Sequence, residues 1–189
     1  MSENILDSDL NEPQKIEVND ARLARFWTRV AASIIDSLIF IPIIILGFYN
    51  MLDLKILPIE IFTTFLGMFY KVYMEWKYQA TFGKIAMKIK VVNENLGAIS
   101  LDQSMVRFSL YFMSYIAGLI AQYYLFTDPD FASVETLNDL VAMQENKRDT
   151  LSSWASVPLI VSVVMVVYDQ KKQALHDKLA NTYCVYVKE

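Results

Sequence analysis

The stretch WTRVAASIIDSLIFIPIIILGFY, residues 27–49, decides the fold because it is long and apolar yet carries two charges. Asp36 interrupts its apolar part, and Arg29 lies seven residues earlier. Seven residues make about two helical turns, so both charges fall on one helical face. This length predicts a membrane-spanning helix, in which a charge costs several kcal/mol unless it is paired or hydrated.

Three further apolar stretches approach membrane length, at residues 56–76, 104–126 and 151–168. With residues 27–49 they predict an all-α membrane protein whose four transmembrane helices form one bundle. Composition agrees, since 54% of the 189 residues are hydrophobic and the mean hydropathy is +0.29. The net charge of −4 argues against a nucleic-acid partner.

Loop charges set the expected orientation. Basic residues precede the first stretch, separate the second from the third, and follow the fourth, whereas the other connections are short or acidic. Basic segments stay cytoplasmic, so we expect both termini inside. Residues 1–21 read as an acidic flexible tail, and residues 22–189 as the membrane domain.

Two regions outside the bilayer look ordered. Residues 88–92 and 182–187 both alternate apolar with polar side chains, which predicts a small sheet under the membrane with Cys184 in its core. On the outer side, residues 130–147 predict a short helix, with Ser133 as its cap.

Helical phase gathers polar side chains on one face of three spans, and we expect these stripes to face inward, away from lipid. The stripes contain Arg29 and Asp36; Glu60, Thr64, Gly67, Lys71 and Glu75; and Arg107, Tyr111, Ser114, Gly118 and Gln122. Arg107 and Lys71 are then the candidate partners of Asp36, while Glu60, near the opposite surface, has no obvious basic partner. Two interpretations fit: buried ion pairs that fix helix order, or a cation or proton route through Asp36.

These residues resemble the RDD family of bacterial membrane proteins, named for an arginine that starts the first membrane helix, an aspartate within it, and a second aspartate. Arg29 and Asp36 match the first two. Further matches follow in order: residues 79–84, residues 90–93, Gly97, Arg107 and residues 169–182. Asp169 and Asp177 both qualify as the second aspartate. Lys88 and Asn181 stand where the family commonly has glycine, so the turns of the sheet are expected to differ.

The resemblance implies a bacterial inner-membrane protein involved in transport, with sodium/proton exchange proposed for some family members. We therefore expect passage of a small cation or other small solute through a site centred on Asp36, positioned by Arg29 and Arg107. The alternative is a non-transporting accessory or assembly subunit of a larger membrane complex.

Other candidates have simpler interpretations. Asp169 and His176, seven residues apart, could form a proton relay, but a helix cap or an interfacial hydrogen bond explains them as well. Basic side chains of the inner connection are expected to meet anionic lipid headgroups; they are Lys84, Lys88 and Lys90. A homo-oligomer or a membrane-complex partner is also expected. We find no nucleophile beside a base, no cofactor motif and no metal-ligand spacing, so the sequence does not predict an enzyme.

Overall fold

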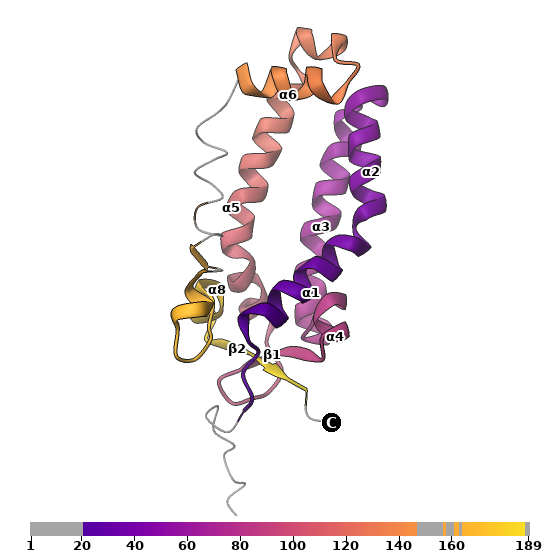
Figure 1. Ribbon diagram of the computed structural model, residues 1–189. Coiled ribbons are helices and arrows are strands. Elements are labelled where there is room, and N and C mark those ends of the chain that lie inside the picture. Colours follow the sequence, from indigo (N-terminus) through magenta and orange to yellow (C-terminus); the bar gives the residue numbers. More distant parts are fainter. Residues whose placement is uncertain (1–20, 147–156, 158–160, 163, 188–189) are drawn as a thin grey trace, which may run out of the picture.

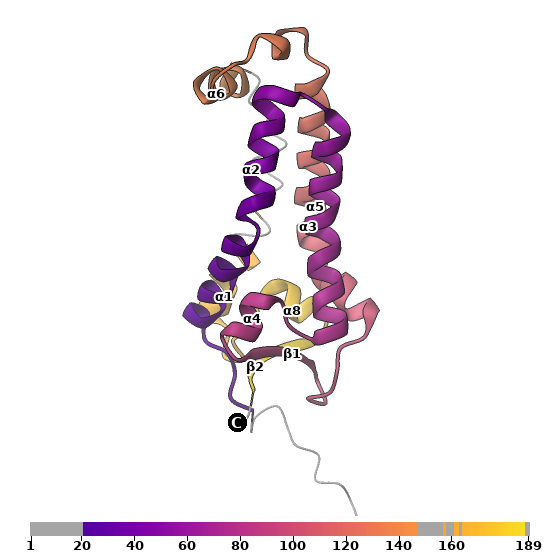
Figure 2. The same cartoon turned by 90° about the vertical axis from the view of Figure 1, so that its right-hand side faces the viewer.

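The computed structural model describes residues 21–146, 157, 161–162 and 164–187. The molecule is elongated, with α2, α3 and α5 running along its length (Figure 1). Short helices and a two-stranded sheet gather at one end, and α6 lies across the other, as the view turned by 90° also shows (Figure 2). We call the first the sheet end and the second the α6 end.

The first predicted span is present but bent. It consists of α1 (Phe26–Ile39) and α2 (Ile41–Tyr49), which continues as a π-helical turn (Asn50–Leu54). The two parts meet at Phe40 with a bend of 51°. Pro42 explains the break, because its ring nitrogen carries no hydrogen and its ring clashes with the carbonyl four residues earlier.

The second and third spans correspond to α3 (Leu57–Tyr78) and α5 (Leu101–Phe126). Ser100 starts α5 with a capping box to Gln103, which satisfies backbone donors at that end. The two helices contact each other along their polar stripes, where the Thr64 hydroxyl donates to Gln122 Oε1 at 3.4 Å. These two stripes therefore face each other where α3 and α5 meet.

The predicted sheet is confirmed as an antiparallel pair, β1 (Ile89–Asn93) with β2 (Thr182–Tyr186), and Cys184 is buried in its core. Lys88 and Asn181 precede the strands with φ of 52° and 51°. This left-handed conformation favours glycine. Lys88 and Asn181 therefore keep the backbone turn that glycine commonly makes at these positions in the family, and the turns do not differ as expected.

Two short helices complete the sheet end, α4 (Phe82–Ala86) and α8 (Leu175–Leu179). Helix α4 lies directly against α1: a Cβ added to Gly83 would come within 1.9 Å of the Ala32 carbonyl oxygen. Only glycine allows this approach.

The α6 end contains a 3₁₀ turn (Pro129–Ser133) and α6 (Leu137–Asn146). The predicted single helix from residue 130 is therefore wrong in its start, and Ser133 is not its cap. Thr136 caps α6 instead: its hydroxyl accepts from the Asp139 N–H at 3.2 Å, and its own N–H donates to Asp139 Oδ2 at 2.9 Å.

Only part of the four-span prediction can be matched to the structure. By length and apolar composition, α5 could cross a membrane, and the bent pair of α1 with α2 and its turn could form a second span. Helix α3 does not meet that criterion among the described residues, because its stripe is polar. Most of the predicted fourth span, residues 151–168, lies outside the described residues. The same holds for residues 1–20 of the predicted acidic tail. The fold shown is mostly helical with a small two-stranded sheet.

Candidate functional site

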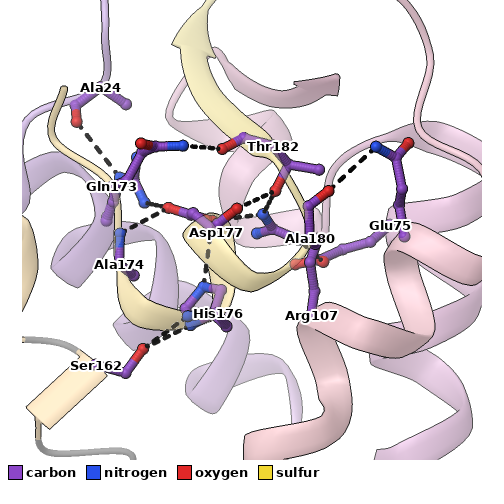
Figure 3. Close-up of polar contacts among 12 residues, drawn as sticks. Ala24, Glu75, Arg107, Ser162, Gln173, Ala174, His176, Asp177, Ala180 and Thr182 are labelled. Atoms are coloured by element: carbon purple, nitrogen blue, oxygen red, sulfur yellow. Dashed lines mark hydrogen bonds and ion pairs between the residues drawn. The ribbon is translucent and has the colours of Figure 1, made fainter. Parts of the chain in front are cut away.

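A charge cluster at the sheet end joins five elements, and Asp177 of α8 lies at its centre (Figure 3). The Asp177 side chain is 0% exposed, and its two carboxylate oxygens bind Arg29 of α1 and Arg107 of α5. The Ala174 N–H also donates to Asp177, at 3.0 Å. The remaining members of the charge cluster are Glu75 of α3 and Lys84 of α4.

Arg107 connects the bundle to the sheet. Its Nε donates to Glu75 Oε2 at 2.8 Å, and its Nη1 binds both Asp177 and the Thr182 hydroxyl of β2. Glu75 in turn binds Lys84. Arg107 and Glu75 are each 3% exposed, so these charges lie out of water and compensate one another.

Burial alone would raise the pKa of Asp177, but Arg107 and Arg29 hold it well below its usual range. Asp177 therefore stays ionised at neutral pH and keeps both arginines. The arrangement is that of a fixed anchor, which ties α8 and β2 to the long helices.

Asp36 has partners that the sequence did not predict. Its Oδ1 accepts from the Tyr70 hydroxyl and the Gly83 N–H, both at 2.8 Å, and its Oδ2 accepts from the Thr81 hydroxyl at 2.6 Å. The expected pairing with Arg107 or Lys71 is wrong. The chain bends just after Asp36, and α1 packs against α4, so the carboxylate faces the α3–α4 connection instead of α5.

Lys71 and Glu60 lie on the stripe of α3, and Lys71 does not form the expected ion pair with Asp36. Lys71 places its Nζ 3.3 Å from the ring centroid of Tyr111 on α5. Glu60 is 6% exposed; its oxygens accept from Asn50 Nδ2 at 3.2 Å and Gln122 Nε2 at 3.3 Å. Among the described residues, no basic side chain pairs with Glu60.

The structure does not bring Asp169 and His176 together as a relay. Asp169 pairs with Lys178, whereas His176 Nδ1 lies 2.8 Å from the Ser162 hydroxyl and packs on Tyr111. Burial lowers the pKa of His176 to about 3, so the ring is neutral. His176 Nε2 also lies 3.4 Å from Asp177, but Ser162 is 1% exposed, so this serine–histidine–aspartate line offers no accessible nucleophile.

Several contributing residues were not singled out from the sequence. The sequence placed Glu75 on the α3 stripe with Lys71, but not as a partner of Arg107. Tyr70, within α3, and Thr81, between α3 and α4, carried no signal, since only the packing of α1 against α4 brings their hydroxyls to Asp36. Within the described residues, no group of three His, Cys, Asp or Glu side chains could hold a metal ion.

Comparison with protein-family models matches the RDD family over residues 23–181. The chain belongs to the RDD family. The resemblance seen in the sequence is thereby confirmed, and with it a membrane-associated domain that contains Arg29, Asp36, Arg107 and Asp177. Searches of curated proteins and of solved structures gave no match.

Proposed function

We propose that this RDD-family protein is a multi-pass protein of a bacterial inner membrane, with four spans and the sheet end in the cytoplasm. Basic segments adjoin the sheet end, whereas the connection at the α6 end is acidic, which supports this orientation. Lys88 and Lys90 would meet anionic headgroups there. Lys84 is less available for lipid, because it binds Glu75.

Within that placement, the protein passes a small cation, by proton or sodium exchange, through a site centred on Asp36. The observation that carries this proposal is the chemistry around Asp36: its carboxylate binds two hydroxyls and one N–H. No basic side chain in the described ranges pairs with it, although the neighbouring charge cluster compensates its own members.

Neutral donors suit an exchanging carboxylate. A carboxylate held by an arginine must break an ion pair to take up a cation, whereas Asp36 needs only a rearrangement of hydrogen bonds. The hydroxyl oxygens of Tyr70 and Thr81 can also turn lone pairs toward a cation. The break at Phe40 lies one turn away, where a change in the angle between α1 and α2 would move this site.

Reconstitution tests the proposal. Purified full-length protein in proteoliposomes should move protons against an imposed sodium gradient, read by a pH-sensitive dye inside the vesicles. Asp36→Asn should lower the rate at least about tenfold, because the isosteric amide cannot carry the charge. Glu94→Gln, which removes an exposed acid from the turn after β1, is the matched control and should keep the wild-type rate. Wild-type flux in Asp36→Asn vesicles would overturn the assignment.

The compensated charge cluster favours one alternative, a non-transporting accessory or assembly subunit. A fixed ionic anchor that joins α1, α3, α5 and α8 needs no moving ion to explain it. In that case the wild type would give no flux of either ion, Asp36→Asn would only lower thermal stability, and a partner would co-purify in mild detergent. Mass determination of the detergent-solubilised particle distinguishes such a partner from a homo-oligomer.

A further inference from the structure

Side chains of α2 and α3 line a groove on a part of the molecule that the Asp36 site does not use. Figure 2 shows the course of these two helices toward the α6 end. Its volume is about 310 Å³. Aromatic rings border it, from Phe40 and Phe48 on one side and Tyr115 on the other, and Glu60 contributes a carboxylate.

The surroundings of Glu60 complement a negative charge. Each carboxylate oxygen accepts one amide N–H, from Asn50 or from Gln122. Glu60 also lies in the first turn of α3, where the free N–H groups of a helix favour an anion. A Cβ added to Gly47 would be 3.7 Å from Glu60 Oε1, so α2 presents its glycine to the carboxylate.

The described residues provide no counter-charge for this buried carboxylate. Lys55, the basic side chain that the structure describes at this end, donates to the Ala132 carbonyl at 2.7 Å and lies near the Phe131 ring. Lys71, on the same stripe of α3 but nearer the sheet end, places its ammonium over the Tyr111 ring. A carboxylate out of water calls for a positive partner.

The residues that line the groove favour an organic cation over a bare metal ion. A bare metal ion prefers several oxygen ligands, carboxylates above all, but Glu60 is the one carboxylate in this lining, whose other residues are apolar or aromatic apart from Thr63 and Thr64. The volume is that of a small-molecule site. A positive charge beside Glu60 with apolar substituents against the three rings would satisfy both parts of the groove.

We propose that this groove binds an organic monocation of the substituted-ammonium class, with its charge on Glu60 and its apolar groups on Phe40, Phe48 and Tyr115. The inference rests on the proposed function only for the membrane placement, and it assigns a second site, distinct from Asp36.

Equilibrium dialysis of the full-length protein in detergent, with benzyltrimethylammonium as the probe, tests this assignment. Glu60→Gln should weaken binding at least about tenfold, because it removes the charge and keeps the shape. Asp53→Asn is the matched control: it removes an exposed acid at the same end, outside the groove lining, and should leave binding unchanged. The uncharged isostere neopentylbenzene should compete poorly.

A second variant keeps the test decisive if Glu60→Gln does not fold. Gly47→Leu extends a side chain into the groove without removing a charge, and should also abolish probe binding. Unchanged binding in a folded Glu60→Gln or Gly47→Leu protein, equal competition by neopentylbenzene, or no binding to the wild type would each overturn the inference. Because Asp36-dependent flux is measured separately, its survival would show that only the groove assignment had failed.

Discussion

Replacement of Asp177 by asparagine should lower the free energy of unfolding by about 3–5 kcal/mol, the cost of leaving buried charges without their partner. Asparagine keeps the shape but removes the charge that Arg29 and Arg107 share. Arg107 would retain Glu75, which Lys84 also binds. Arg29 would retain only uncharged acceptors, the carbonyls of Lys172 at 2.8 Å and Ala24 at 3.4 Å.

Asp169→Asn is the matched control, since it makes the same chemical change eight positions earlier. Asp169 pairs with Lys178, whose side chain is 41% exposed. The Asp169 side chain is 14% exposed and its Oδ2 also accepts the Gln173 N–H at 3.0 Å, a bond that the asparagine oxygen can keep. The loss is then that of a pair with one exposed partner, about 0–1 kcal/mol, so this variant should unfold almost as the wild type does.

The assay is denaturant-induced unfolding of both variants in detergent micelles, followed by tryptophan fluorescence. The account requires a much larger loss for Asp177→Asn than for Asp169→Asn. If both variants lose less than about 1 kcal/mol of unfolding free energy, the anchoring role of the charge cluster is refuted, because a loss that small is typical of an exposed ion pair.

Three further predictions concern the sheet end. Wild-type stability should fall by up to about 1.4 kcal/mol per unit as pH drops below 6.5, because burial lowers the pKa of His176 to about 3 and the unfolded chain takes up the proton first. His176→Gln should lack this slope in unfolding curves recorded from about pH 7 to pH 5. Gly83→Ala should lower the free energy of unfolding by about 1–3 kcal/mol or more, as in an overpacked core, because the new Cβ would collide with the Ala32 carbonyl. An unchanged melting temperature would contradict the tight approach of α4 to α1. Lys88→Gly should raise stability by up to about 1 kcal/mol by relieving its left-handed backbone, whereas Lys90→Gly within β1 should lower it; equal effects in thermal unfolding would argue against the strain.

Patterns local to one segment could be read from the sequence. Alternation predicted both strands, and helical phase predicted which faces of α3 and α5 meet, because each follows from the period of a single element. The bend after Ile39 also had a local sign, Pro42, which the length of the apolar run outweighed.

Partners across the fold could not be read in the same way. Helical phase placed Arg29, Asp36 and Arg107 on inward faces, but a face does not specify which neighbour it meets. Arg29 binds Asp177, 148 positions away, and Asp36 binds the connection that only the packing of α4 on α1 brings near. The Arg29 contact also favours Asp177 over Asp169 as the family's second aspartate.

Site-directed labelling tests most directly whether the chain crosses the membrane with its sheet end inside. In a Cys184→Ala background, Asn95→Cys places an exposed thiol at the sheet end, and Ala132→Cys places one at the α6 end. A membrane-impermeant maleimide added to intact spheroplasts should label the Ala132→Cys protein, and should label the Asn95→Cys protein only after lysis. Labelling of both proteins before lysis, or of neither, would contradict the membrane-spanning account.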